Sequence, residues 1–489
     1  MALKLDDETL NDILGAEDAE NENAGRLKEY FYKNKAYESL RASLPLRVLV
    51  GHKGVGKSAL LKVSEIEDQE ENLLSIWITP TDLAKPLSES SDDFNRLVGV
   101  WKDEIKKLIV ERSWLALGAS EGRPILDGAV NTSKDLVAII TKAISDKAGN
   151  AFDQTKKLIL DKFKSEKVIR VYIDDLDRGW QSRKADIRRI SALLTALRDI
   201  CGADRSVQIR LALRTDVYFL VRTSDESTDK IERNIIWLQW TNQEILLVLA
   251  KRISTYFGES LTSDQWDALP QKEIASRLHR ISEPKFSQAG KWENAPMHRV
   301  LLSLTRRRPR DLIKLLYGAG KQAHRKNHTV ITTSDFRDTF ESYSNERLQD
   351  IINEFKSELP EVDQILKLMK PAKKTKTTLE SYTFTKDALI QKIKSVKQNV
   401  AVHFTNDTFP SEQNIANFLY KIDFITARYT RDDGFIDRKY FDQNRLLQDQ
   451  FFDAGYAWEI HPAYRWALQP SDVNSIIDRL ELEGSNSII

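Results

Sequence analysis

Two short segments carry residue types whose spacing suits phosphate chemistry. The first reads GHKGVGKS over residues 51–58 and fits the pattern G-x-x-x-x-G-K-[ST]. It directly follows the apolar run RVLV and precedes a segment with helical periodicity, which is the context that this pattern requires. Backbone N–H groups of such a loop turn inward around phosphate oxygens, and the amino end of the next helix adds partial positive charge. The segment is therefore predicted to be a phosphate-binding loop.

The residues of this loop have separate predicted roles. We expect Lys57 to reach the β- and γ-phosphates of a nucleotide and the Ser58 hydroxyl to bind Mg²⁺. The glycines let the backbone approach the phosphates closely. The predicted nucleotide-binding residues are Gly51, Gly54, Gly56, Lys57, Ser58 and Ala59.

The second segment reads VIRVYIDDLDRGW over residues 168–180, a β-branched run followed by three aspartates within four positions. Asp174, directly after the predicted strand, is expected to hold Mg²⁺ through water. Asp175 is expected to orient or deprotonate the attacking water, with a turn or helix cap as the alternative. Asp177 and Arg178 form a local ion pair, or the arginine reaches a phosphate in a neighbouring subunit; the residues leave both open.

Composition limits the classes of protein to consider. A chain of 489 residues suggests two to four domains. The 74 Lys plus Arg nearly balance the 73 Asp plus Glu, so the chain has no large net charge that would attract nucleic acid or a membrane surface. Cys201 is the single cysteine, which excludes internal disulfides and multi-cysteine zinc sites. The amino terminus lacks the order of a signal peptide, and no apolar run reaches about 18 residues. We expect a soluble, cytoplasmic protein without a membrane partner.

The order of strand-like and helix-like segments predicts the fold class. Strand patterns at residues 47–50, 73–79, 168–173 and 207–213 are separated by helical stretches, which indicates an α/β fold with a parallel sheet. From about residue 241 the pattern is nearly all helical. The predicted organisation is an acidic tail (1–24), a P-loop domain (25–240) with a helical insertion at about 95–165, a helical lid (241–360), a basic linker (361–382) and a winged-helix-like domain (383–489).

These motifs and several later segments resemble the KAP-like and STAND-like branch of bacterial P-loop ATPases, which is related to the AAA+ group. The likeness includes IDDLDR, LALRTDVYFLV, IIWLQWTNQEILLVLAKRI and TRRRPRDLIKLL, in that order, over roughly residues 25–350. It implies an AAA+-like sheet, a helical lid and a winged-helix-like carboxy-terminal domain. It also implies that Arg214 or Thr215 senses the γ-phosphate and that Arg310 is a second sensor on the lid. A strand-end salt bridge and a helix-start ion pair are the alternatives.

Other nucleotide-binding classes fit less well. A GTPase would carry a DxxG after the second strand, but Leu176 stands three residues before Gly179, and no NKxD follows. An LSGGQ-like signature of ABC ATPases is also absent. The expected ligands are therefore ATP and Mg²⁺.

The carboxy-terminal segment has the order of a winged helix: two helices, then two short strands about a turn at residues 431–434. A DNA-binding role rests on the lysine-rich stretch before it and on four cations near the wing, Arg428, Arg431, Arg438 and Lys439. Five aspartates interleaved over residues 423–442 oppose a basic face, which favours protein docking or a structural role. His461 precedes a proline and is expected in a turn or the core.

The function that these observations favour is an ATP-binding and ATP-hydrolysing molecular switch. The family resemblance implies a regulatory or sensor role in a bacterial defence-type system beside a separate effector protein. The alternative is a DNA-binding ATPase that loads on or remodels nucleic acid through the winged helix. We also expect a homo-oligomer in which one subunit donates an arginine to the next, with a monomer as the alternative. The candidate arginines are Arg178, Arg214, Arg233 and those between residues 306 and 310.

Overall fold

The computed structural model describes residues 3–17, 19–83, 93–116, 163, 165–176, 180–224, 226–287, 292–371, 382–432, 435–443 and 455–468. The chain forms two compact units. Asn23–Lys28 and Lys33–Leu238 make up the P-loop unit, and Met1–Glu22, Glu29–Tyr32 and Gln239–Ile489 make up the C-terminal unit. No helix in these described ranges is long and apolar enough to cross a membrane.

The P-loop unit is built on a five-stranded parallel sheet with the order β2-β3-β4-β1-β5. Its strands are β1 (Leu46–Gly51), β2 (Leu74–Ile78), β3 (Ile169–Ile173), β4 (Val207–Arg214) and β5 (Ile235–Trp237). All five residues of β3 are buried, as expected for a parallel strand covered on both faces. The predicted parallel α/β sheet is confirmed.

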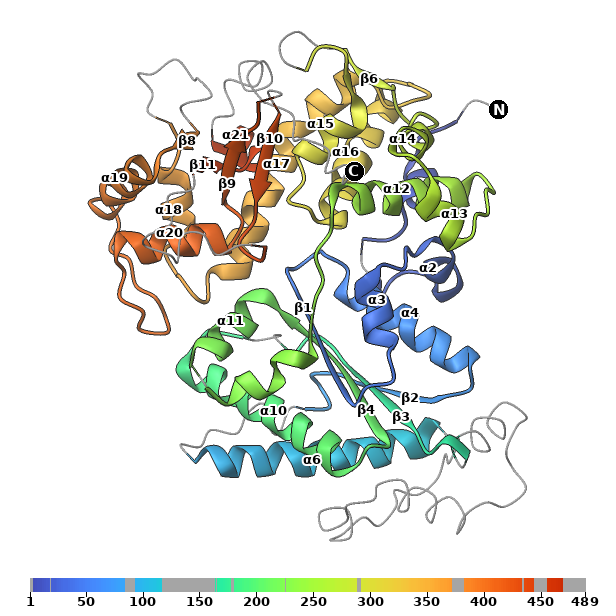
Figure 1. Ribbon diagram of the computed structural model, residues 1–489. Coiled ribbons are helices and arrows are strands. Elements are labelled where there is room, and N and C mark those ends of the chain that lie inside the picture. Colours follow the sequence, from blue (N-terminus) through green and yellow to red (C-terminus); the bar gives the residue numbers. More distant parts are fainter. Residues whose placement is uncertain are drawn as a thin grey trace. The chain divides into compact units, whose positions relative to one another are not determined.

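Helices cover both faces of this sheet. Figure 1 shows α3 (Lys35–Arg41) and α4 (Lys57–Glu70) on one face, and α6 (Phe94–Ala116) and α10 (Lys184–Ala203) on the other. The remaining elements are α2 (Ala24–Tyr30), α11 (Thr215–Ser224) and the 3-10 helix η1 (Glu226–Asn234). The insertion expected at about 95–165 is helical over α6, and most of its remainder lies outside the described residues.

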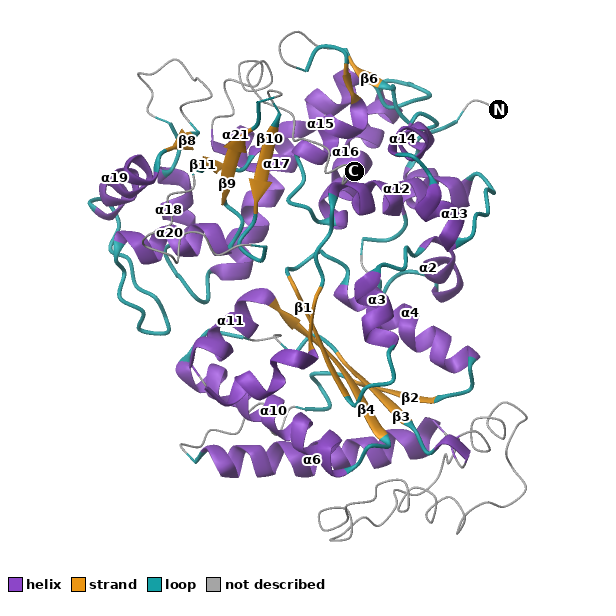
Figure 2. Ribbon diagram, viewed as in Figure 1, coloured by secondary structure: helices purple, strands orange, loops and turns teal. Residues whose placement is uncertain are grey.

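The C-terminal unit begins with a group of helices, interrupted by one short hairpin (Figure 2). The helices are α12 (Asn242–Tyr256), α13 (Ser263–Ala268), α14 (Gln271–Leu278), α15 (Met297–Ser303), α16 (Pro309–Arg325), α17 (Thr333–Phe355) and α18 (Val362–Leu368). The hairpin pairs β6 (Lys285–Phe286) with β7 (Ala295–Pro296). The linker expected at 361–382 differs from the structure in its first part, because Val362, Ile365 and Leu366 of α18 are buried. Residues 372–381 lie outside the described ranges.

A smaller module of two helices and an antiparallel sheet follows in the same unit. It contains β8 (Thr383–Phe384), α19 (Lys386–Lys397), α20 (Glu412–Lys421), β9 (Ile425–Thr430), β10 (Ile436–Lys439), β11 (Ala457–Ile460), η4 (Pro462–Tyr464) and α21 (Arg465–Leu468). The sheet order is β10-β9-β11-β8. The two helices and the β9–β10 pair follow the order expected from the sequence, while β8 and β11 were not foreseen.

The amino-terminal segment, expected to be an acidic tail, contains a packed helix. Residues Asp7–Leu14 form α1, whose Leu10, Ile13 and Leu14 are buried. This helix packs against α12 and α16. A Cβ built on Gly320 of α16 would lie 2.5 Å from the Leu10 side chain, so the absence of a side chain there permits the close approach.

Buried charges connect the helices of the C-terminal unit to its antiparallel module. Arg306 donates through Nε and Nη2 to the two carboxylate oxygens of Asp311, at 2.7 and 2.8 Å, and Arg347 donates to Asp311 at 2.9 Å. Arg306 also donates to the Tyr464 hydroxyl at 3.0 Å. Arg308 donates to Asp423 at 2.6 Å. Burial by itself raises the pKa of Asp311, but the surrounding arginines hold that pKa well below its ordinary value.

We predict that Asp311→Asn destabilises the protein by about 3–5 kcal/mol, because the buried guanidinium of Arg306 loses its counter-charge and that of Arg347 loses its buried carboxylate partner. Because the pKa of Asp311 is lowered on folding, its contribution to stability is present above about pH 4 and is lost as the pH falls further. Chemical denaturation at pH 7 and at pH 3 measures both effects.

The matched control is Asp338→Asn, which removes a carboxylate that is 53% exposed and pairs with Lys326 on the surface. This change is expected to cost under about 1 kcal/mol. Equal losses in the two variants would contradict the role assigned to the buried group.

Candidate nucleotide-binding site

The glycine-rich loop lies where the sequence placed it, between the end of β1 and the start of α4. Gly54 and Gly56 have φ values of 83° and 95°, a left-handed region that side chains other than glycine rarely adopt. A Cβ on Gly51 would lie 2.8 Å from the Val55 side chain. The loop therefore needs glycine at these three positions to keep its conformation.

Lys57 is held across this loop. Its ammonium group donates to the backbone oxygens of Gly51 and His52, at 2.8 and 3.1 Å. Lys57, Ser58 and Ala59 are each partly exposed at the amino end of α4. The first turn of the helix thus presents a cation, a hydroxyl and backbone donors at one place.

The carboxyl end of β3 supplies the acidic side chains. Asp174 is 8% exposed, and its Oδ1 accepts a hydrogen bond from the backbone of Asp175 at 2.8 Å. Asp175 is exposed, with φ at 59°, so the chain turns sharply as it leaves the strand. Asp177 and Arg178 lie outside the described residues.

Parallel pairing brings these groups to one edge of the sheet. β4 lies between β1 and β3, and strands in a sheet are about 4.8 Å apart, so the ends of β1 and β3 are about 10 Å from each other. Side chains from both ends can approach one hydrated ion across that span. The glycine loop with Lys57, the hydroxyl of Ser58 and the carboxylate of Asp174 fit a nucleotide with Mg²⁺, an ion that usually keeps several waters and takes few carboxylate ligands.

The end of β4, between these two strands, carries the predicted sensor residues. Arg214 pairs with Gly51 in the sheet register, but its guanidinium group forms a two-point ion pair with Asp216, at 3.0 and 2.7 Å. The strand-end salt bridge is therefore what the structure contains. Thr215 is fully buried, and its hydroxyl has no hydrogen-bond partner among the described residues. The Thr215 hydroxyl is therefore available to form a hydrogen bond at this strand end.

The other predicted arginines lie in different environments, and two of them are held in buried ion pairs. Arg310 lies in the C-terminal unit, in the first turn of α16, and is partly exposed. Its neighbours Arg306 and Arg308 are buried in the ion pairs described above. The prediction that these two arginines could reach a neighbouring subunit was therefore wrong. Arg233 is exposed at the end of η1, directly before β5.

Two of the four cations proposed for a DNA-binding wing are buried, while Arg431 and Lys439 are partly exposed. Arg438 is 1% exposed and donates to Glu459 at 2.6 Å, and Arg428 is buried beside Thr383. Arg431 is partly exposed and lies 3.9 Å from Asp437. His461 is buried and bonded to the Tyr440 hydroxyl at 3.0 Å, in agreement with the expected core position.

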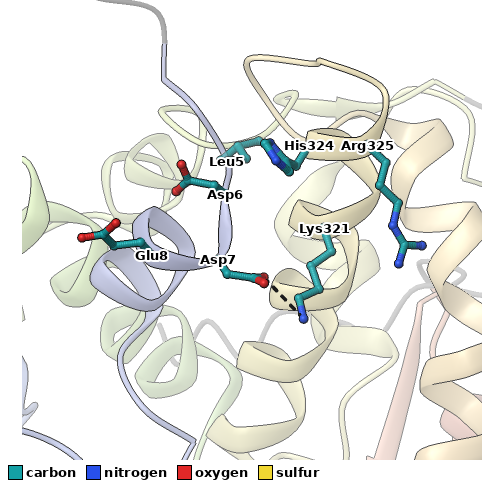
Figure 3. Close-up of a pocket in the computed structure, with 7 residues that line it drawn as sticks. All are labelled: Leu5, Asp6, Asp7, Glu8, Lys321, His324 and Arg325. Carbon is teal, nitrogen blue, oxygen red and sulfur yellow. Dashed lines mark ion pairs between the residues drawn. The ribbon is translucent and has the colours of Figure 1, made fainter.

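A surface pocket in the C-terminal unit does not suit a phosphate ligand. Figure 3 shows α1 on one side of it and α16 on the other, with Asp7 paired to Lys321 at 3.4 Å. Its lining residues are Leu5, Asp6, Asp7, Glu8, Lys321, His324 and Arg325. Three carboxylates face two permanently cationic side chains, so the pocket has no positive excess to attract an anion.

Residues 243–352 match a family described as the FunZ-associated C-terminal helical domain. Over 330 residues the chain is 22% identical to the transposon gamma-delta 80.3 kDa protein of Escherichia coli K12, covering 65% of this chain and 44% of that protein. The chain thus spans less than half the length of this relative. It is also 27% identical over 148 residues to allergen Alt a 2 of Alternaria alternata, covering 30% of this chain and 68% of the allergen.

Two solved structures are similar over much of the chain, at low scores. The ORC2 protein of Aeropyrum pernix, in ADPNP–ADP complexes, aligns at 13% identity and a TM-score of 0.39, over 91% of this chain and 92% of that chain. The RuvB branch migration motor of Thermotoga maritima aligns at 12% identity and a TM-score of 0.26, over 66% and 74%. The matched helical domain and the sheet with its glycine loop show a P-loop type α/β unit followed by a helical C-terminal region.

Proposed function

We propose that this protein binds ATP with Mg²⁺, hydrolyses it, and uses the cycle as a molecular switch. The observation that carries the proposal is the meeting of a glycine loop, Lys57 and Asp174 at one edge of a parallel sheet. When bound, Mg²⁺ would supply positive charge that offsets the charge of the phosphates. In this chain Lys57 binds the β- and γ-phosphates, Ser58 contacts the ion, and Asp174 holds it through water.

The remaining site residues have proposed roles in turnover. Asp175 is exposed at the same edge and orients or deprotonates the attacking water. The two sensor candidates are Arg214, at the end of β4, and Thr215, at the start of α11. Thr215 fits better, because Arg214 is held in an ion pair with Asp216. Arg310, in the C-terminal unit, is proposed to be the second sensor of the nucleotide.

The biological setting is a further part of the proposal. We assign the switch a regulatory or sensor role in a bacterial defence-type system, acting with a separate effector protein, on the family resemblance of the motifs. The relative named for transposon gamma-delta connects a similar chain with a mobile genetic element. The DNA-remodelling alternative is less well supported, because Arg428 and Arg438 are buried.

Replacing Lys57 with alanine is expected to abolish ATP binding, because it removes the cation that faces the β- and γ-phosphates. Calorimetric titration with ATP and Mg²⁺ measures the effect, with the melting temperature as the check on folding. Lys62→Ala is the matched control, since Lys62 lies on the same helix outside the loop and pairs with Glu65. Unchanged affinity in Lys57→Ala would place the phosphates elsewhere.

The two leading aspartates are expected to separate binding from turnover. Asp175→Asn should retain ATP and lose turnover by about two to four orders of magnitude, because it removes the group that acts on water. Asp174→Asn should weaken Mg²⁺-dependent binding itself. Steady-state ATPase rates and titrations with and without EDTA distinguish the two, and normal hydrolysis by both variants would refute these roles.

Arg233 is our candidate for the arginine that a neighbouring subunit donates in a homo-oligomer. Arg233→Ala is expected to lower turnover by on the order of 10³-fold with ATP binding intact, whereas Lys230→Ala, on the same 3-10 helix, should have no effect. Mixing Arg233→Ala with Lys57→Ala subunits should restore turnover, since each supplies what the other lacks. A monomeric mass by light scattering with ATP, and no recovery on mixing, would exclude the donated arginine.

A further inference from the structure

One face of β3 is polar although the strand is buried on both sides. Successive side chains of a strand alternate between the two faces of the sheet, so Arg170, Tyr172 and Asp174 share one face. Arg170 is 5% exposed and Tyr172 is fully buried. An apolar strand would fill this position at lower cost, since buried polar groups must be hydrogen-bonded. The arrangement therefore calls for a physical reason.

The two polar side chains before Asp174 are bonded to α4, the helix that begins at the glycine loop. The Tyr172 hydroxyl donates to Asp68 Oδ2 at 2.5 Å and lies 2.9 Å from Ser64 Oγ. Because the phenol has a single proton and gives it to Asp68, the Ser64 hydroxyl is the donor in the second contact. Arg170 pairs with the other oxygen of Asp68.

The Tyr172 hydroxyl stays protonated and can therefore donate a hydrogen bond. Burial and the nearby Asp68 carboxylate both raise the pKa of Tyr172 above its ordinary value, so the hydroxyl keeps its proton. Asp68 is itself fully buried and is paired with a second arginine, Arg41 of α3. Each member of the cluster thus has its partner in a different element: Arg41 in α3, Ser64 and Asp68 in α4, and Tyr172 in β3.

The direction of the elements links this cluster to the nucleotide site. α4 runs antiparallel to β3, because it returns from the carboxyl end of β1 and both strands are parallel. Moving from Ser64 to Ser58 covers six residues, or about 9 Å of helix. Moving from Tyr172 to Asp174 covers two residues, or about 7 Å of strand. A lengthwise shift of α4 along β3 would therefore change the Ser64–Tyr172 distance and the Ser58–Asp174 distance together.

We propose that the hydrogen bonds of Tyr172 to Asp68 and Ser64 form a clamp that fixes α4 lengthwise against β3, so that Ser58 and Asp174 are held at the separation that one Mg²⁺ requires. Tyr172 is thus a positioning residue and does not touch the nucleotide. Directional hydrogen bonds specify this register more closely than non-directional apolar contacts in the same place would. This inference rests on the proposed function, and it names a residue that sets the geometry of that site.

Tyr172→Phe tests the clamp with little other disturbance. Phenylalanine keeps the ring and its stacking on Trp77, where the two ring centres are 5.6 Å apart, and removes only the hydroxyl. The measurement is the affinity for a non-hydrolysable ATP analogue, adenylyl imidodiphosphate, by calorimetry in Mg²⁺ and again in EDTA. The ratio of the two affinities reports the Mg²⁺ site separately from phosphate binding by the loop.

In Tyr172→Phe we expect the affinity in EDTA to stay within about twofold of wild type. The ratio of affinities in Mg²⁺ and in EDTA should fall about 10- to 100-fold, the effect typical of losing a group that orients a metal ligand. Ser64→Ala, which removes one of the two partners of the hydroxyl, should lower the ratio in the same direction by less. ATP turnover by the two variants should follow the same order.

Tyr37→Phe is the matched control. The buried Tyr37 of α3 also donates from a phenol to a carboxylate of α4, Glu67, but makes this bond from outside β3. We expect it to lower the melting temperature by an amount similar to Tyr172→Phe while leaving the ratio unchanged. If the two tyrosine variants change the ratio equally, or neither does, the clamp is refuted. A wild-type protein that binds no analogue in either condition would instead overturn the proposed function.

Discussion

The parallel direction of the five central strands is the constraint on which the candidate site depends. Carboxyl ends of parallel strands lie at the same edge, so residues far apart in sequence are gathered there. Gly51 ends β1, Asp174 follows β3, and Thr215 follows β4. Because β4 lies between β1 and β3, the buried hydroxyl of Thr215 lies between the phosphate loop and Asp174.

Buried charge is the second organising feature, and it occurs in both units with the same logic. In the P-loop unit, Asp68 is enclosed by Arg41 and Arg170, and in the C-terminal unit Asp311 is enclosed by Arg306 and Arg347. A buried carboxylate of this kind adds little net stability over an apolar pair but is costly to disrupt. Each cluster joins elements that are distant in sequence, and the requirement for full pairing specifies how those elements meet.

This use of charge also bears on the carboxy-terminal module. Four cations near the β9–β10 turn were the basis for a DNA-binding role, and five interleaved aspartates opposed that role. Two of them, Arg428 and Arg438, are buried, and Arg438 shares Glu459 with Arg465. Their charge is neutralised within the module, so the surface there is less basic than the four cations alone would make it. Docking of a protein partner is compatible with that surface and stays a prediction.

Local patterns in the sequence were sufficient for the features that depend on neighbouring residues. The glycine spacing around Lys57 predicted the loop, since left-handed φ values and close backbone approach are local requirements. Apolar, β-branched runs located four of the five strands, all but the three-residue β5, and their alternation with helices predicted the parallel sheet. The order of two helices and a strand pair near the carboxyl end was also readable, because each element has its own periodicity.

The tertiary structure alone decided which side chains meet. Tyr172 is bonded to Asp68 across 104 positions of sequence, and Arg306 to Tyr464 across 158. An arginine read alone cannot indicate whether it ends in solvent, on a phosphate or beside a buried carboxylate, since burial and partner depend on packing. The same holds for the acidic amino terminus, whose Leu10, Ile13 and Leu14 become core only because α12 and α16 provide an apolar face. Sequence determined the local conformations and the chemical groups, and long-range packing determined their partners.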